Sequence, residues 1–236
     1  DPATLSFGAL NGVGLPLTQT LQFTNAGSSS VNLTFSISAA STASTASLSV
    51  SPTSLSLGAG SNGSVTVQLS GSTPAAGVYE GFVVVQGAPK PLRIPYMFLV
   101  GDGIAANIIP LSGSGFDGTV GQQIPSNLSP QGLAFKVIDQ YGLPVTNAPV
   151  TFAVLSGGGL QSGASLGSGN STTTDQYGLA YASPVLGSSV GSYSFTGSAG
   201  GQTVEFDGTA RLPPSINNGG IVDGANFTSG RAVAPG

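Results

Sequence analysis

Hydrophobic and polar residues alternate with a period of two along most of the chain, the pattern of a strand with one buried face. In the first hundred residues this pattern and two longer apolar runs predict seven strands. They are Leu17–Phe23, Val31–Ile37, Leu48–Val50, Leu55–Leu57, Val65–Leu69, Phe82–Val85 and Leu92–Val100. Turn residues separate the runs, as in Asn25-Ala26-Gly27 and Gly58 to Gly63. Short strands at this spacing are typical of a β-sandwich.

The second half of the chain repeats the pattern after a break at Gly101-Asp102-Gly103. Its predicted strands are Leu133–Ile138, Val150–Val154, Leu179–Ala182, Tyr193–Thr196 and Val204–Phe206. A second break follows at Pro213-Pro214, and no helix of useful length is visible. The sequence therefore predicts an all-β fold of two tandem antiparallel sandwiches, immunoglobulin-like or fibronectin type III-like, over residues 1–103 and 104–212. Residues 213–236 are expected to form an extended tail.

One five-residue sequence occurs twice, as Asp139-Gln140-Tyr141-Gly142-Leu143 and Asp175-Gln176-Tyr177-Gly178-Leu179. An aspartate at the first position of a turn accepts hydrogen bonds from amides two residues on, and glycine suits the fourth position of a type I turn. The repeat therefore predicts two similar tight turns at strand ends. Two acidic loops also offer oxygen ligands of the kind that calcium takes.

The composition fits folded β structure better than helices. Charged residues make up only 6% of the 236 residues, and a helical protein spreads more charge than this over its outward faces. A sheet covers its outer face with Ser and Thr instead. Glycine and proline are abundant, at 37 and 16 residues, but stay below the content that signals disorder. The cores must be built from aliphatic residues and Phe, because there is no tryptophan.

Charge and cysteine content exclude several classes of function. The net charge is −4, and the five basic residues are Lys90, Arg93, Lys136, Arg211 and Arg231. They are scattered, whereas a nucleic-acid binder needs clustered Lys and Arg, so nucleic acid is excluded as a partner. The chain has no cysteine, which removes disulfides, thiolate catalysis and sulfur-ligated metals. No apolar run has the length of a membrane helix. Because the chain begins Asp1-Pro2 without Met, we expect a piece of a longer protein.

Several segments of the second half carry a resemblance to a known family. They are Phe135-Lys136-Val137-Ile138-Asp139, Gly142-Leu143-Pro144-Val145, Pro149-Val150-Thr151-Phe152, Thr174-Asp175-Gln176-Tyr177-Gly178-Leu179-Ala180 and Phe206-Asp207-Gly208-Thr209-Ala210. With them, residues 104–212 resemble the group 1 bacterial Ig-like domain of the invasin and intimin type. This resemblance implies a module that stacks as a rigid spacer and presents a terminal binding unit. The lectin-like unit of those adhesins is absent here, so receptor binding is not implied.

The first half and the tail carry two further resemblances. The segments of the first half are Leu21–Gly27, Val50-Ser51-Pro52, Val78–Val83 and Arg93–Phe98. With them, residues 1–101 are similar to the fibronectin type III-like domain that follows the catalytic domain in subtilisin-like cell-envelope proteases. That similarity implies a protease domain before Asp1. From Pro214 onward, Gly219–Phe227 and Val233–Gly236 resemble the start of a carboxy-terminal segment of acidobacterial secreted proteins.

Three patterns match catalytic or cofactor motifs but lack the chemistry. Gly163-Ala164-Ser165-Leu166-Gly167 matches a nucleophile elbow, yet the chain has no histidine to take the serine proton. A Ser–Lys pair with Lys90 or Lys136 stays formally open, although Lys136 lies in a predicted strand. Gly58 to Gly63 and Gly113 to Gly118 match the dinucleotide fingerprint, which needs a following helix. Both lead into extended segments, so hairpin turns explain them better.

Carboxylates supply the remaining candidate chemistry. Glu205 and Asp207 are close in sequence on one strand face, where a glycosidase pair is the alternative to a solvated face. No aromatic platform lies near them, so the solvated face is favoured. Four aspartates lie in predicted loops and offer calcium ligands: Asp102, Asp117, Asp139 and Asp175. No EF-hand spacing exists, and we expect turn formation to explain each of them.

The sequence therefore gives no catalytic, cofactor-binding or metal-binding residue, and no cofactor is expected. The leading hypothesis is a non-catalytic structural or spacer module of a secreted or cell-surface bacterial protein, such as the accessory region of a subtilisin-like protease. Its expected partners are neighbouring domains of the same parent protein, without membrane insertion. The alternative is an adhesion module that binds a surface protein or a carbohydrate through loops at a sandwich end. An enzyme in its own right is opposed by the lack of His and Cys.

Overall fold

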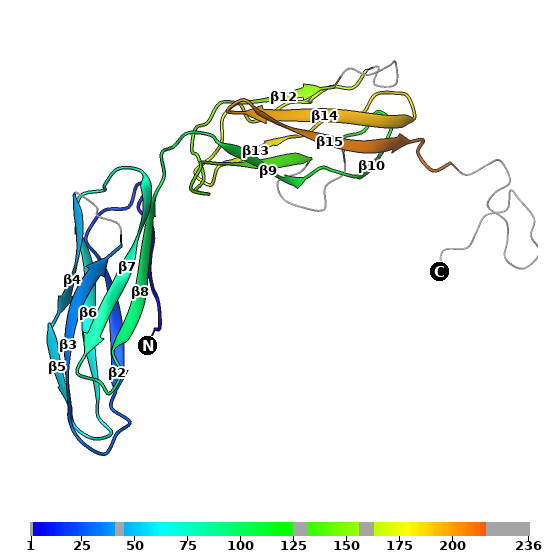
Figure 1. Ribbon diagram of the computed structural model, residues 1–236. Helices are drawn as coiled ribbons and strands as arrows, with labels where there is room; N and C mark the ends of the chain where they lie inside the picture. Colours follow the sequence, from blue (N-terminus) through cyan, green and yellow to red (C-terminus); the bar gives the residue numbers. More distant parts are fainter. Residues whose placement is uncertain (1, 41–44, 125–131, 156–162, 216–236) are drawn as a thin grey trace, which may run out of the picture. The chain divides into compact units, whose positions relative to one another are not determined.

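The computed structural model describes residues 2–40, 45–124, 132–155 and 163–215. Over these ranges the chain is all-β, and its fifteen strands are joined by turns and extended segments without any helix (Figure 1). It follows that no described helix is long and apolar enough to span a membrane. The predicted fold class is confirmed.

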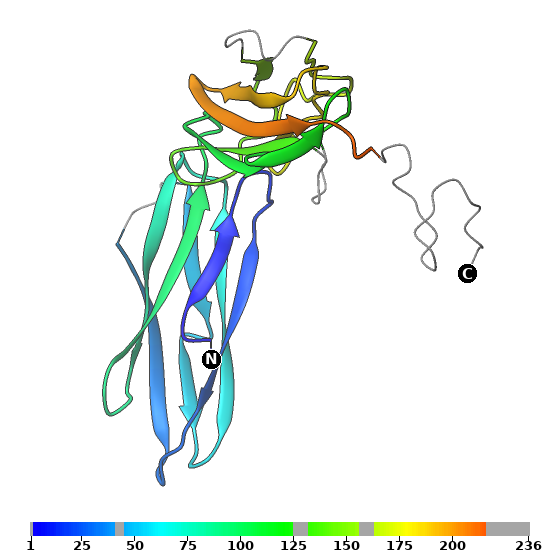
Figure 2. The same ribbon diagram turned by 90° about the vertical axis from the view of Figure 1, so that its right-hand side faces the viewer.

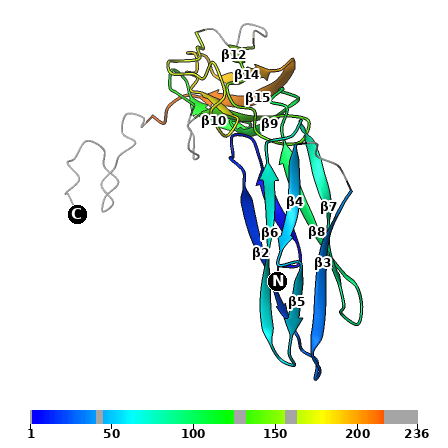
Figure 3. The same cartoon turned by 90° about the vertical axis from the view of Figure 1, so that its left-hand side faces the viewer.

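The first eight strands form two sheets. They are β1 (Leu5–Ala9), β2 (Leu17–Thr24), β3 (Val31–Ala39), β4 (Ala46–Ser51), β5 (Ser54–Leu57), β6 (Asn62–Gly71), β7 (Gly77–Gln86) and β8 (Leu92–Val100). One sheet has the strand order β1-β8-β7-β3-β5, and the other has the order β2-β6-β4 (Figure 3). Leu21 and Val67 of the smaller sheet share one hydrophobic core with Val83 and Phe98 of the larger sheet. The two sheets therefore pack face to face as a sandwich.

The remaining seven strands form a second pair of sheets. They are β9 (Asn107–Ser112), β10 (Phe116–Thr119), β11 (Leu133–Ile138), β12 (Val150–Val154), β13 (Leu179–Ala182), β14 (Gly191–Ala199) and β15 (Gln202–Arg211). Their orders are β10-β15-β14-β12 and β13-β11-β9. The rings of Phe135 on β11 and Phe152 on β12 lie 5.1 Å apart, centroid to centroid, so the two sheets meet through their inner faces. This half is a second sandwich.

Each sandwich is mainly antiparallel, as the sequence predicts, and also contains a parallel strand pair. β1 runs parallel to β8, from the pair Leu5 and Tyr96 to the pair Ala9 and Leu99. β10 runs parallel to β15 in the same way. Figure 2 shows β1 in dark blue along the edge of its sheet. An early strand is thus bonded to the last strand of its sandwich in both halves.

The predicted strands are all present, and the structure adds three. β1, β9 and β10 were not predicted, because each is short and breaks the alternation. β1 contains Gly8 with a φ of 73°, β9 contains Pro110, and β10 has only four residues. β1 and β10 are the parallel strands, which form through a partner far away in sequence. Their own residues carry little strand signal.

The chain divides into two compact units. The first contains residues 1–109, 136–149 and 173–179, and the second contains residues 110–135, 150–172 and 180–236. Both Asp-Gln-Tyr-Gly turns therefore belong to the first unit. The boundaries 1–103, 104–212 and 213–236 stay predictions, and most of the expected tail lies outside the described residues.

Candidate functional site

The repeated Asp-Gln-Tyr-Gly sequence forms the same turn twice, as predicted. Oδ1 of Asp139 accepts hydrogen bonds from the backbone N–H groups of Tyr141 and Leu143, at 2.9 and 2.8 Å. Oδ1 of Asp175 accepts them from the N–H groups of Tyr177 and Leu179, at 2.8 and 2.9 Å. In each turn the glycine N–H donates to the carbonyl of the aspartate, at 3.1 and 3.0 Å.

Both turn glycines require the left-handed backbone region. Gly142 has a φ of 79° and Gly178 a φ of 74°, which residues with a Cβ rarely adopt. A Cβ on Gly178 would also lie 3.1 Å from Cβ of Pro144, which belongs to the loop after the first turn. The backbone N–H of Val137 donates to the carbonyl of Gly178 at 2.8 Å. The two turns therefore lie next to each other within the first unit.

Asp139 is the more deeply placed of the two aspartates, since it is only 3% exposed. Its Oδ2 accepts a third hydrogen bond, from the backbone N–H of Asp102 at 3.1 Å. Both oxygens of this carboxylate therefore already face amide hydrogens, which would have to be displaced before a cation could bind. Within the described residues, no three His, Cys, Asp or Glu side chains gather as a metal-binding group.

Asp102 and Asp117, the other two aspartates that the sequence places in loops, also have structural partners. Oδ1 of Asp102 accepts from the N–H of Ile104 at 2.9 Å, and its Oδ2 accepts from the side-chain amide of Gln140 at 2.7 Å. The sequence predicts that Asp117 lies in a loop. This prediction is wrong, because Asp117 lies on β10. Its Oδ1 lies 2.8 Å from Nε of Arg211, across the parallel pair. The calcium alternative finds no preformed site among the described residues.

The remaining sequence candidates lie on a strand face and in a β-bridge. Glu205 and Asp207 lie on the same face of β15, and the hydroxyl of Ser194 donates to both carboxylates, at 3.0 Å to Glu205. This is the solvated strand face that the sequence favours. Ser165 exchanges two backbone hydrogen bonds with Val185, at 3.0 and 2.8 Å, so it sits in a β-bridge rather than in a strand-to-helix elbow.

The glycine patterns likewise belong to turns. Gly58 to Gly63 covers the turn after β5 and the first two residues of β6, and Gly113 to Gly118 covers the turn after β9 and the first three residues of β10. Neither precedes a helix, so neither offers the amide cluster that would bind a pyrophosphate. Lys136 lies on β11 as predicted.

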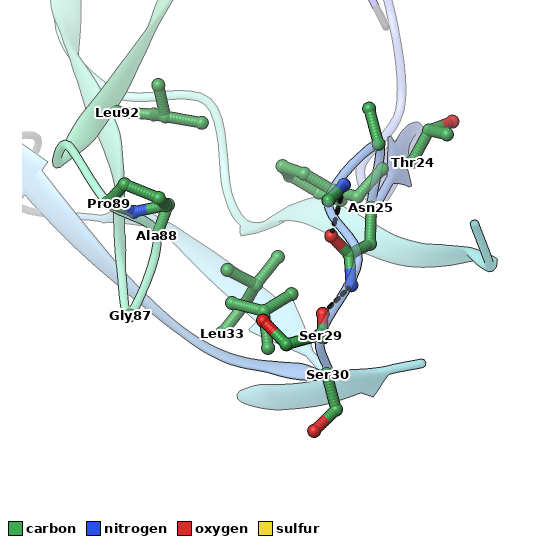
Figure 4. A pocket seen from close by; sticks show the side chains of 13 residues that line it. Thr24, Asn25, Ser29, Ser30, Leu33, Gly87, Ala88, Pro89 and Leu92 are labelled. Atoms are coloured by element: carbon green, nitrogen blue, oxygen red, sulfur yellow. Dashed lines mark hydrogen bonds between the residues drawn. The ribbon is translucent and has the colours of Figure 1, made fainter. Parts of the chain in front are cut away.

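A cleft opens at one end of the first sandwich, between the β2–β3 turn and the β7–β8 turn (Figure 4). It encloses about 510 Å³, and its apolar wall contains Phe23, Val31, Leu33, Ala88 and Leu92. Leu92 is 45% exposed at its mouth. The sequence did not predict this cleft, because residues 23–33 and 87–92 meet only in the folded sandwich.

Asn25 at the rim of the cleft is a structural residue. Its side-chain amide donates to the carbonyl of Ser29 at 2.8 Å, and its Oδ1 accepts from the N–H of Gly27 at 3.0 Å (Figure 4). The same amide donates to the carbonyl of Gly58 at 2.9 Å. These bonds tie the β2–β3 turn to the β5–β6 turn. The polar atoms of Asn25 are therefore engaged within the protein, and the cleft presents mainly its apolar wall.

Comparison with known proteins identifies no family. No protein-family model matches the sequence, and neither does any curated protein. Among solved structures, domains 5–6 of the S-layer protein SbsC match with 21% identity over 89% of this chain and 95% of that chain, at a TM-score of 0.30. The CupB2 chaperone of Pseudomonas aeruginosa matches with 11% identity over 87% of this chain and 96% of that chain, at a TM-score of 0.34.

A shorter match covers 42% of this chain and 95% of SSP-19, an MSP-domain-like protein of Caenorhabditis elegans, with 10% identity and a TM-score of 0.30. Likenesses at these values carry no functional argument. The fold assignment rests on the sheet orders and the buried cores. The resemblances to the invasin-type Ig domain and to the subtilase accessory domain stay predictions.

Proposed function

We propose that the chain is a structural module that carries tension between the parts of a larger secreted or cell-surface protein. The observation that supports this most is the parallel pairing of an early strand with the last strand in both sandwiches. The chain enters the first sandwich at the start of β1 and leaves it at the end of β8. These two points lie at opposite ends of one parallel strand pair.

This pairing determines how a pulling force acts on the first sandwich. Tension along the chain pulls β1 and β8 in opposite directions along their own axes, so the backbone hydrogen bonds between them are sheared together. In an antiparallel hairpin pulled at its open end, the bonds would break one after another. Shearing many bonds at once takes a larger force than breaking them singly, and a spacer under tension needs that resistance.

The polar groups of the loops support a structural function. The aspartates of both repeated turns hold backbone amides, and Asn25 ties two turns together. The chain also lacks the His and Cys residues on which most acid–base and nucleophilic catalysis depends. We place the domain boundaries of this module at 103/104 and 212/213. An accessory region of a subtilisin-like protease is the parent context that the sequence resemblance suggests.

Single-molecule force spectroscopy of the chain tests the proposal. We expect two separate unfolding events, one for each sandwich. The first sandwich should unfold at a higher force when it is pulled from the start of β1 and the end of β8 than when it is pulled from the start of β1 and the start of β8. Equal forces in the two directions would contradict the proposal.

The cleft of the first sandwich favours a second candidate function, the binding of an apolar or amphipathic ligand. Its apolar wall and its volume of about 510 Å³ fall in the range of small-ligand sites. Ala88→Trp would fill the mouth of the cleft, whereas Ala75→Trp adds the same side chain at an exposed loop position that does not line it. Screening the chain against glycans and short peptides, followed by titration of both variants, tests this function. A ligand that binds Ala88→Trp as tightly as the wild type binds outside the cleft, and this result would contradict the second candidate function.

A further inference from the structure

The outer faces of the first sandwich are polar on most strands. Outward positions on β2, β3, β4, β5 and β6 carry Ser, Thr, Asn or Gln. They are Thr18, Thr20, Gln22, Asn32, Thr34, Ser36, Ser38, Ser47, Ser49, Ser54, Ser56, Ser64, Thr66, Gln68 and Ser70. This is the pattern of a sheet whose outer side faces water.

β7 and β8 depart from this pattern. They are adjacent in the larger sheet, and their alternate residues fill the core. Their outward residues, which we call the β7–β8 face, are mostly apolar: Val78, Glu80, Phe82, Val84, Gln86, Arg93, Pro95, Met97 and Leu99. Val78 and Met97 are 45% and 42% exposed, so neighbouring strands do not cover them. A contiguous exposed apolar strip rimmed by polar residues marks an interaction surface.

The charged residues of the first sandwich lie on the same two strands and in the turn that connects them. Between residues 2 and 101 the sequence contains only three charged residues, Glu80, Lys90 and Arg93. Glu80 is paired with Met97 in the strand register, and Arg93 is paired with Val84, four residues along β7. Phe82 and Pro95 form the pair between them. One acidic and one basic group therefore flank the middle of an apolar strip.

Arg93 is held over this strip. The Cζ atom of its guanidinium lies 5.7 Å from the centroid of the Phe82 ring. Beside Met97 a groove of about 380 Å³ opens on the same face, lined by Thr4, Ser6, Phe82 and Pro95 among others. The face thus offers a basic group, an acidic group, an apolar strip and a hollow that can accept a side chain.

We propose that the β7–β8 face binds the same face of a second copy of this chain. A two-fold axis that lies in the plane between the copies, over Phe82 and Pro95, exchanges the positions of Glu80 and Arg93. Each Glu80 then faces Arg93 of the other copy, and Phe82 and Pro95 pack on their counterparts. An interface of this kind is isologous and needs a patch that complements itself. Opposite charges on either side of an apolar centre meet that need.

The size of the face predicts weak association. Strands lie about 4.8 Å apart and rise about 3.3 Å per residue, so β7 and β8 with their neighbours β1 and β3 cover roughly 20 by 20 Å on each copy. Two such faces bury on the order of 800 Å², the low end of protein interfaces, where complexes are reversible. We therefore expect a dimer that forms at high protein concentration, with a Kd on the order of 100 µM.

Charge reversal on the full chain tests the pairing of Glu80 with Arg93. Sedimentation equilibrium across protein concentrations should show a monomer–dimer equilibrium. Glu80→Arg and Arg93→Glu each replace two attractive contacts with two repulsive ones, so each should weaken dimerisation about tenfold or more. The double variant restores the pairs with their signs exchanged and should recover the wild-type Kd. It also keeps the net charge of −4, so recovery cannot come from overall charge.

The matched control is Thr20→Arg, which adds a positive charge to an outward position of the other sheet. It should leave the Kd unchanged, and circular dichroism melts should show that all variants are folded. A chain that stays monomeric at millimolar concentration would overturn the proposal. A dimer whose Kd is indifferent to the single reversals would also overturn it, and so would a double variant as weak as the single ones.

Discussion

Replacing the aspartates of the two repeated turns by alanine should have very different consequences for stability. Asp139 is buried and its carboxylate accepts three backbone hydrogen bonds, from Tyr141, Leu143 and Asp102. Asp175 is exposed and accepts two. A net hydrogen bond contributes about 1 kcal/mol, and a buried amide left without its acceptor costs more than an exposed one that water can reach. We expect Asp139→Ala to lower the free energy of unfolding by about 3 kcal/mol and Asp175→Ala by about 1 kcal/mol.

Asparagine separates the geometry of the turn from its charge. Asp175→Asn keeps an oxygen that can accept from both amides, so this variant should stay within about 0.5 kcal/mol of the wild type. In Asp139→Asn the new amide group faces the N–H of Asp102, where an acceptor is needed, and we expect a loss of about 1–2 kcal/mol.

The assay is urea unfolding followed by circular dichroism, with each transition fitted separately and measured in calcium and in EDTA. The two turns share one sequence, so each serves as the control for the other. Equal losses for the two alanine variants would refute the hydrogen-bond argument. A wild-type transition that shifts with calcium and loses the shift in Asp139→Ala would show that these turns bind the ion.

Three further predictions concern the cores and the surface. A Cβ on Gly81 would lie 2.6 Å from the hydroxyl of Tyr96. Thermal unfolding should therefore show that Gly81→Ala is less stable than the wild type by about 2 kcal/mol or more. Gly14→Ala is the control, because a Cβ there meets open space and should change the stability little. Burial raises the pKa of the Tyr96 phenol, so the unfolded chain releases this proton first. The stabilisation that this group provides is therefore fully present below about pH 10 and is lost as the pH rises above that value. In thermal melts at alkaline pH, Tyr96→Phe should lose less stability with rising pH than the wild type. The Asp117–Arg211 ion pair is exposed, so Asp117→Asn should cost less than about 1 kcal/mol, and a larger loss would mean the pair is not screened by water.

The strands that bury one face were predictable from sequence, because alternation reports burial directly. β8, β11, β12 and β13 begin and end where the apolar runs predict. β14 and β15 are longer than predicted, since Gly, Ser and Thr at their ends extend the pairing without adding an apolar signal. The parallel strands β1 and β10 could not be predicted, because their hydrogen-bond partners lie about 90 residues away in each case.

The local chemistry of the loops was also predictable, and the surfaces were not. The Asp-Gln-Tyr-Gly turns form through bonds between residues at most four apart, so five residues specify them. Asp117 was misplaced because the short strand that contains it was missed. The cleft and the β7–β8 face depend on which strands become neighbours. The apolar run from Leu92 to Val100 shows that both sides of β8 are hydrophobic, but it does not show what lies against the outer side.

The proposed resistance of the first sandwich to tension depends on the direction of the force, and this is its most direct test. Because the chain has no cysteine, two introduced cysteines can serve as unique attachment points. Pulling between Ala3→Cys and Gly103→Cys loads β1 and β8 in shear. Pulling between Ala3→Cys and Pro91→Cys loads the same parallel pair from one end, so its bonds break in sequence. We predict a clearly higher unfolding force in the first geometry, and equal forces in the two geometries would contradict the account.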